Sequence, residues 1–402
     1  MTKVWTLQFP ISYVIEGDDC YRRIADAGIE RVLLCSVIYS PYRLVMPRYP
    51  QRAVYSLEEG RYYYQPEAAR YAGLPVQPQA STDFAGRDVL GEATVAMRKA
   101  GVSPAAWVTV FANGSIAKQH PDWAVQNLYG SADRLFLCPN HPEVREYSLR
   151  VCAEVAERYD IDELMLDKIP QTCLELNAFA GRIDPVLRTL GSFCFCEHCQ
   201  KAALSQGLDL ARFKTEALRL ATDTLTIAPH LVNSQAAELT GDNEIPLLML
   251  DNPWLLDILR FRIESIKSFL VELRERLARP ALELSLCFVP HAKIGHDASS
   301  PRAWLAAQSY EAYRESPINT IHSVVHWDVD TVEYNTRRAV NAVAGSPVKI
   351  CTHLRAYGAT NPAEIGAMSK AALRGGADGL AYFCHDLMTE DMLKAIGEEQ
   401  GK

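Results

Sequence analysis

Short apolar runs alternate with amphipathic stretches from one end of the chain to the other. The apolar runs are rich in β-branched and aromatic residues and almost continuously apolar, which is typical of parallel strands covered on both faces. We predict eight strands, at residues 3–9, 31–38, 105–111, 162–167, 282–290, 318–327, 347–354 and 378–385.

The stretches between these strands carry helix start signals. Asp88 precedes an amphipathic run over residues 89–101, Asn361 and Pro362 precede a second run, and Thr389 precedes a third. Eight strands that alternate with helices predict an α/β fold, a closed (β/α)₈ TIM barrel. A doubly wound open sheet is the alternative, but the Gly-rich turn expected after its first strand does not follow residue 9.

Two segments are longer than the repeat requires. Residues 39–87 are rich in aromatic residues and proline, and residues 170–257 contain a cysteine cluster and further helices. We therefore expect one barrel domain over residues 1–402, with long insertions after strands 2 and 4. Both insertions follow C-terminal strand ends, where barrel enzymes build their substrate pockets. The alternative is that both insertions are additions to the barrel without a function of their own.

Composition and charge narrow the classes of partner. The chain has 402 residues, a formal net charge of −8 and no basic run, which argues against nucleic acid and anionic membranes. No apolar run reaches the roughly 18 residues that a membrane span needs. The first residues lack the features of a signal peptide, so we expect a cytoplasmic protein. Its eleven cysteines are then expected to be reduced thiols or metal ligands.

A series of motifs covers residues 88–199: RDVLGEATVAMRKAG, AWVTVFANG, HPDWAVQN, LCPNHPEVREY, ERYDIDELMLD and FCFCEHC. This series resembles bacterial glycoside hydrolase-like TIM-barrel proteins. A Cys-Pro segment ahead of a C-x-C-x-x-C cluster is also similar to the β-galactosidases of glycoside hydrolase family 42. The resemblance implies a carbohydrate-active barrel, and the remaining strands resemble these proteins only in architecture.

Asp167 is the strongest catalytic candidate. It ends the fourth apolar run, so its side chain is expected at the catalytic rim. The resemblance implies that Asp167 protonates the glycosidic oxygen as general acid. Glycoside hydrolysis needs two carboxyl groups beside the scissile bond. A role in shaping the rim, paired with a neighbouring cation, is the alternative.

The second carboxyl group is harder to find, because the end of the seventh strand offers no Asp or Glu. Asp328 after strand 6 and Asp386 after strand 8 are the nearest candidates. We prefer Asp328, because Trp327 beside it is suited to stacking on a sugar ring. Capping of the following helix is the alternative role for both acids.

Further polar residues gather at the same strand ends. Lys168 follows Asp167 and is expected to be a structural rim cation, a partner for an anionic sugar such as a uronate, or a Schiff-base lysine. Four histidines follow consecutive strands and are predicted to line one pocket with Asp328 or Asp386, for sugar binding, acid/base chemistry or a divalent metal. These histidines are His291, His326, His353 and His385. Asn113, Arg355 and Tyr382, together with Tyr39, Tyr357 and Trp107, suit a polyol ligand, although Trp107 fits the core equally well.

The cysteine cluster predicts a structural zinc site. Cys194, Cys196 and Cys199 place three thiols on one tight turn, close enough to share a tetrahedral ion. The family 42 resemblance implies Cys138, in its Cys-Pro segment, as the fourth ligand; Cys173 and His198 are competitors. Four thiolates would close the site to water. Reduced thiols or a labile disulfide are the alternative.

Together these residues predict an enzyme, a glycoside hydrolase that cleaves an O-glycosyl bond and needs no organic cofactor. Two alternatives stay open. One is a metal- or lysine-assisted lyase, isomerase or aldolase that acts on a sugar acid, and the other is an inactive barrel that binds glycans. The sequence does not determine the sugar or its anomeric configuration. It also leaves the oligomeric state open, and a homo-oligomer is possible.

Overall fold

Eight parallel strands close into a barrel in the computed structural model, which describes residues 3–169, 184–227, 245–289, 305–325, 329–357 and 360–401. The order around the barrel is β1, β2, β7, β10, β11, β12, β13 and β14, and β14 pairs again with β1. These strands span Lys3–Gln8, Arg31–Cys35, Ser103–Thr109, Glu163–Asp167, Glu283–Phe288, Thr320–Val324, Lys349–Arg355 and Gly379–Phe383. The predicted (β/α)₈ barrel is confirmed, with each predicted run containing all or most of one strand.

Helices cover the outside of the barrel. They are α1 (Pro10–Glu16), α2 (Asp19–Asp26), α3 (Val89–Lys99), α5 (Pro142–Arg158), α10 (Trp254–Arg276), α11 (Tyr310–Tyr313), α12 (Val329–Val343), α13 (Pro362–Arg374) and α14 (Glu390–Glu399). The three predicted start signals are confirmed. Side-chain oxygens of Asp88, Asn361 and Thr389 accept backbone N–H groups at the starts of α3, α13 and α14, over 3.0, 3.0 and 3.3 Å.

The segment 39–87 forms short strands and turns beside the barrel. The pairs are β3 (Arg43–Val45) with β4 (Val54–Ser56) and β5 (Arg61–Tyr62) with β6 (Gln79–Ala80), joined through 3₁₀ turns η1 (Pro50–Arg52) and η2 (Ala68–Tyr71). A fully buried carboxylate on α5 holds this segment. Glu154 accepts the backbone N–H of Glu67 over 2.7 Å and the hydroxyl of Tyr71 over 2.5 Å.

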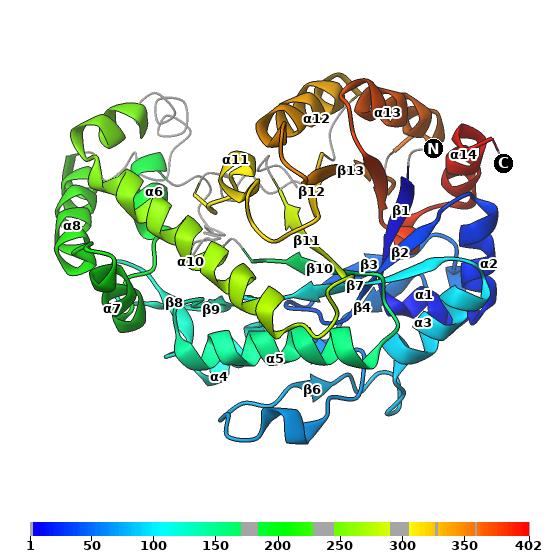
Figure 1. Cartoon of the computed structure of the whole chain (residues 1–402), viewed down its shortest axis with the longest axis horizontal. Helices are drawn as coiled ribbons and strands as arrows, with labels where there is room; N and C mark the ends of the chain where they lie inside the picture. Colours follow the sequence, from blue (N-terminus) through cyan, green and yellow to red (C-terminus); the bar gives the residue numbers. More distant parts are fainter. Residues whose placement is uncertain are drawn as a thin grey trace.

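A further excursion, which the apolar pattern does not predict, separates β7 from α5. It contains α4 (Gly114–Gln119) and the hairpin of β8 (Ala124–Gln126) and β9 (Ala132–Leu137). The insertion after β10 contributes α6 (Pro185–Gly191), α7 (Glu197–Ser205) and α8 (Leu210–Ile227), at the left of Figure 1. These helices, the first turns of α10 and the β8–β9 hairpin share a second apolar cluster, apart from the barrel core.

The interior of the barrel is unusually polar. Strand side chains alternate between the two faces of a sheet, and the inward set includes charged and polar residues among the apolar ones. Arg31, Glu163, Ser285, His322 and His353 are all buried.

No helix of the described part of the chain combines the length and apolar character needed to cross a membrane.

Candidate active site and cysteine cluster

Asp167 is the last residue of β10 and lies at the C-terminal end of the barrel, where it is 7% exposed. Nε1 of Trp107, on the neighbouring strand β7, donates to Oδ2 of Asp167 over 3.1 Å. The backbone N–H of Lys168 donates to Oδ1 over 2.8 Å. Each carboxylate oxygen therefore accepts one N–H donor, which fixes the orientation of the group.

Two buried thiols lie close to this carboxylate, Cys35 on β2 and Cys287 on β11. Burial, and then the charge of Asp167, raise the pKa of both thiols well above the usual range. Both sulfurs are therefore uncharged near neutral pH. Because the thiolate is the nucleophilic form of cysteine, neither residue is suited to covalent catalysis here.

Aromatic rings surround Trp107. The ring of Phe9, directly after β1, lies 5.4 Å from Trp107, and the ring of Phe383 at the end of β14 lies 6.3 Å from it. Tyr357 lies 5.9 Å from Phe383. Phe383 and Tyr357 are only half-buried, so ring surface remains accessible at this end of the barrel.

Lys168 turns away from the line of β10, because its φ of 54° lies in the left-handed region. The strand ends at Asp167, so the alternation of side chains stops there. Nζ of Lys168 lies 5.0 Å from the centre of the Tyr39 ring, in a cation–π arrangement that stabilises the charged amine. The half-buried Lys168 is thus a cation at the end of the barrel, close to Asp167.

His353 and His385, the two predicted rim histidines within the described residues, belong to separate networks. His353 is fully buried, and its Nε2 lies 2.7 Å from Nδ1 of His322. Nε2 of His322 lies 2.7 Å from Oε1 of Glu163, whose other oxygen accepts from Arg31 over 2.6 Å. Burial alone raises the pKa of Glu163, but His322 and Arg31 outweigh it and lower that pKa to about 2.

His385 and Asp386 belong to a second buried network, in the turn η3 (His385–Leu387) after β14. Arg48, from the segment 39–87, donates to His385 over 3.0 Å. Burial and then Arg48 lower the pKa of His385 well below its usual value, so its imidazole is neutral.

The carboxylate of Asp386 holds the start of α1. It accepts the backbone N–H of Phe9 over 2.6 Å and the hydroxyl of Ser12 over 2.7 Å, and it is fully buried. Burial raises the pKa of Asp386 to about 6, although these bonds and Arg48 oppose the shift. Asp386 therefore has a role like the helix capping given as its alternative, but the helix that it holds is α1.

The other predicted ligand residues are placed individually. Asn113 caps α4, because its Oδ1 accepts the N–H of Ile116 over 3.1 Å. The hydroxyl of Tyr382 lies 2.8 Å from Ser369 on α13, so the ring faces the helix layer and not the barrel interior. Arg355 is half-buried at the end of β13, 3.6 Å from Glu364. His291, His326, Trp327 and Asp328 lie outside the described residues.

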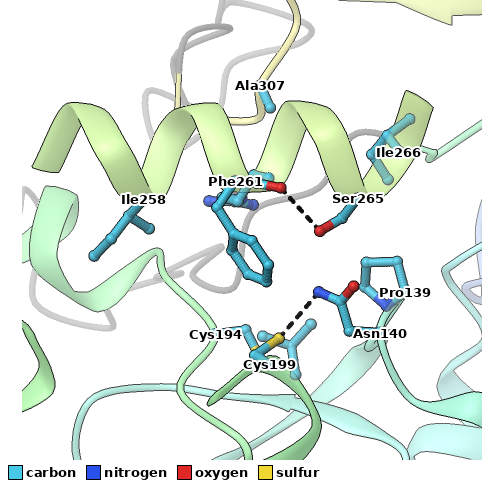
Figure 2. A pocket seen from close by; sticks show the side chains of 11 residues that line it. Pro139, Asn140, Cys194, Cys199, Ile258, Phe261, Ser265, Ile266 and Ala307 are labelled. Carbon is cyan, nitrogen blue, oxygen red and sulfur yellow. Dashed lines mark hydrogen bonds between the residues drawn. The ribbon is translucent and has the colours of Figure 1, made fainter. Parts of the chain in front are cut away.

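The cysteine-rich turn lies between the β8–β9 hairpin and α10. A narrow cavity of about 40 Å³ separates Cys194 and Cys199 from Phe261 and Ser265 on α10 (Figure 2). Asn140, next to the Cys-Pro segment, donates to the sulfur of Cys199 over 3.4 Å. The turn thus meets elements from three separate parts of the sequence.

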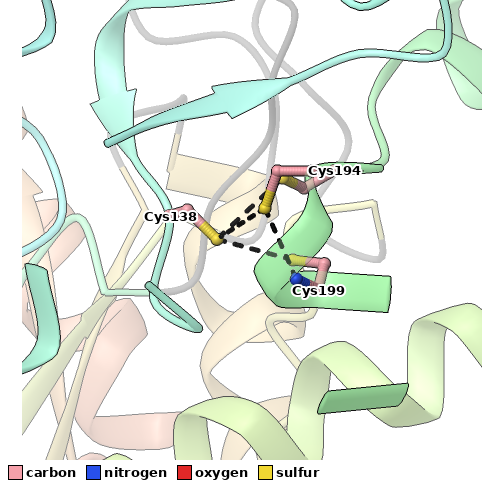
Figure 3. A group of neighbouring side chains, drawn as sticks. Cys138, Cys194 and Cys199 are labelled. Carbon is pink, nitrogen blue, oxygen red and sulfur yellow. Dashed lines mark hydrogen bonds between the residues drawn. The ribbon is translucent and has the colours of Figure 1, made fainter. Parts of the chain in front are cut away.

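Four sulfur atoms converge in this turn (Figure 3). Sγ of Cys138 lies 3.5 Å from that of Cys196, 3.4 Å from that of Cys199 and 4.0 Å from that of Cys194. The backbone N–H of Gln126 donates to Cys194 over 3.4 Å. This group is able to hold a metal ion, and the predicted fourth member, Cys138, is the one that completes it.

Sequence reasoning missed the polar interior of the barrel. Glu163 and His322 stand within apolar runs, and a charged or titratable residue inside such a run is the signal that could have revealed them. Arg48 carried no comparable signal, since it lies in an irregular segment whose position depends on the fold.

Comparison with known proteins agrees with this architecture. Residues 54–173 match a family model described as Glycosyl hydrolase-like 10. A comparison with curated protein sequences gives no match.

Two solved structures are similar in fold. One is α-L-fucosidase isoenzyme 2 from Paenibacillus thiaminolyticus, with 14% identity over 100% of this chain and 49% of that chain and a TM-score of 0.53. The other is the catalytic domain of β-amylase from Paenibacillus polymyxa, with 10% identity over 99% of this chain and 97% of that chain and a TM-score of 0.58. The chain thus spans about half the length of the fucosidase and nearly all of the amylase domain. Both structures share the (β/α)₈ barrel fold with this chain, and the family model matches it over residues 54–173.

Proposed function

We propose that this protein hydrolyses a glycosidic bond in a carbohydrate, with Asp167 as one of the two carboxyl groups that the reaction needs. The observation that carries this proposal is the position of Asp167 at the C-terminal end of β10, with an N–H donor on each oxygen. Catalytic residues of TIM barrels sit at these strand ends. The match of residues 54–173 to a glycosyl hydrolase-like family supports the same chemistry.

The two donors bear on the role of Asp167. Both oxygens of Asp167 accept an N–H group, from Trp107 and from Lys168, whereas a general acid must donate a proton to the glycosidic oxygen. We therefore propose Asp167 as the nucleophile or base of the pair, in place of the proton donor that the resemblance implies.

The proton donor must then come from another residue. Asp386 is poorly suited, because it is fully buried and bonded to Phe9 and Ser12 at the start of α1. Asp328 lies outside the described residues and remains the candidate from the sequence.

The half-buried rings of Phe383 and Tyr357 support a sugar ligand, because the apolar face of a pyranose packs on aromatic surface. Lys168 would add a positive charge for a sugar acid. A Schiff-base role for Lys168 has less support, because the ring of Tyr39 stabilises its charged form, while an imine-forming lysine must lose its proton.

We further propose that Cys138, Cys194, Cys196 and Cys199 hold a structural Zn²⁺, as in the family 42 resemblance. Four sulfurs placed tetrahedrally at about 2.3 Å from zinc are about 3.8 Å apart. The separations of 3.4, 3.5 and 4.0 Å from Cys138 fit this geometry. With four thiolates the ion would join the helical insertion to the β8–β9 hairpin within one domain, and it would not activate water.

The test is activity on a panel of aryl glycosides and aryl uronides, measured for the wild type and Asp167→Asn. We expect hydrolysis of at least one substrate class and a loss of at least about 100-fold in kcat on substitution. Full activity in Asp167→Asn would overturn the assignment. A uronide preference that falls when Lys168 is changed to Met would identify the anionic sugar.

A further inference from the structure

We propose a second metal site inside the barrel, formed by Nδ1 of His322, Nε2 of His353 and Sγ of Cys351, for a first-row divalent ion such as Zn²⁺. His322 comes from β12, and the other two come from the neighbouring strand β13. The three side chains are fully buried, and their ligand atoms all lie within 4.8 Å of one another. The proposal rests neither on the glycosidase activity nor on the cluster around Cys138.

Glu163 sets which nitrogen of His322 is available to an ion. Its carboxylate accepts from Arg31 and from the hydroxyl of Ser285, so it is an acceptor toward its third neighbour as well. Nε2 of His322, 2.7 Å away, must therefore carry the hydrogen, which leaves a lone pair on Nδ1. A carboxylate behind an imidazole is the usual arrangement of a metal-bound histidine.

The lone pair of His322 is directed at the other candidate ligands. Its Nδ1 lies 2.7 Å from Nε2 of His353, so a hydrogen bond joins the two rings when no ion is bound. Around a tetrahedral ion at about 2.0–2.1 Å, two nitrogens lie about 3.3 Å apart. The rings need to separate by about 0.6 Å, and the ion replaces the proton between them.

Small residues of β14 lie opposite the two ligands from β13. In the pairing of β13 with β14, His353 lies opposite Ala381, and Cys351 lies opposite Gly379. Neither partner carries a bulky side chain, whereas large aliphatic residues normally fill the interior of a TIM barrel. The ring of Trp5, 5.2 Å from that of His322, covers the cluster on the side of β1.

A hollow lies at the N-terminal end of the barrel, opposite to the candidate active site, and reaches Cys351. This hollow of about 270 Å³ is lined by Cys351, Trp5, Thr320, Glu283 and Lys3, among others. Two histidines and a thiol suit zinc and similar borderline ions better than Ca²⁺ or Mg²⁺, which prefer oxygen ligands.

The first experiment measures zinc bound per chain in full-length protein titrated to saturation. We expect Cys351→Ser and His353→Gln each to bind one ion fewer than the wild type. Cys152→Ser is the matched control, since Cys152 is an equally buried thiol on α5, outside both clusters. Its zinc content should equal that of the wild type. An unchanged zinc content in folded Cys351→Ser would overturn the proposal.

A second measurement needs no variant and decides the question if the substitutions prevent folding. X-ray absorption at the zinc edge of the saturated wild type should show nitrogen at about 2.0–2.1 Å besides sulfur at about 2.3 Å. A shell of sulfur alone would mean that only the Cys138 cluster holds zinc, and the inner site would be refuted. A mixed shell that loses its sulfur in Cys351→Ser would instead refute the outer site and keep the inner one.

Discussion

The indole N–H of Trp107 donates to Oδ2 of Asp167 over 3.1 Å, so the carboxylate at the end of β10 is held from the neighbouring strand. The bond crosses the β7–β10 pair, in which Thr109 lies opposite Asp167 and Trp107 is two residues before it. Trp107 is therefore both a core residue and a partner of the candidate catalytic group.

Trp107→Phe keeps the aromatic ring and removes only the donor. We expect kcat to fall by roughly 10- to 100-fold, because a hydrogen bond to a charged group is worth about 1.5–3 kcal/mol. Steady-state kinetics on an aryl glycoside that the wild type hydrolyses measures this effect.

Trp123→Phe is the matched control. Trp123 is equally buried, and its Nε1 donates to the carboxylate of Glu143 over 3.0 Å, away from the end of β10. Its substitution should leave kcat unchanged. An equal kcat for the two variants would show that the bond to Asp167 has no role in catalysis.

Asp167→Asn tests the role proposed for this carboxylate. If Asp167 is a nucleophile, substrates with good and poor leaving groups should both lose activity by at least about 100-fold, and added azide should restore turnover. A proton donor would instead leave good leaving groups almost unaffected. Asp160→Asn, on an exposed residue paired with Arg98, is the control and should retain wild-type kinetics.

The barrel was predictable because strands buried on both faces consist of nearly continuous apolar runs, which few other elements have. The hairpin β8–β9 was not, because β8 has only three residues and β9 (ADRLFL) begins with polar residues and lacks a continuous apolar run. The cysteine group was predictable in part, since three of its members lie within six residues of one another and the fourth depended on a resemblance.

The histidines show where sequence reasoning stops. His353 and His385 both stand near the ends of apolar runs, which suggested one pocket. His353 lies within its strand and bonds to His322, whereas His385 lies beyond its strand and bonds to Arg48. Position along a strand fixes the direction of a side chain. Its partners, however, come from other segments, and the apolar pattern of the sequence does not predict where those segments lie.

Cys196→Ser should abolish the proposed zinc binding at the outer cluster and loosen the helical insertion. Because four thiolates would close the ion to water, activity on aryl glycosides should change little. We expect faster proteolytic cleavage within α6–α8, while the circular dichroism of the barrel is retained. Cys152→Ser, a buried thiol outside the cluster, should match the wild type. A large loss of activity with an intact fold would indicate a catalytic metal instead.

Asp386 should make stability depend on pH in an identifiable window. Its pKa is about 6 in the folded chain against an ordinary value of 3.8, so between these values the folded state holds a proton that the unfolded state has lost. The resulting stabilisation is present below about pH 4, declines as the pH rises and is gone above about pH 6.

Asp386→Asn keeps an acceptor for the N–H of Phe9 but cannot titrate. The unfolding free energy of the wild type minus that of Asp386→Asn, from urea titrations at pH 4–7, should fall by up to about 3 kcal/mol and then level off. Because both chains share every other titratable group, a difference that stays constant over this range would contradict the raised pKa.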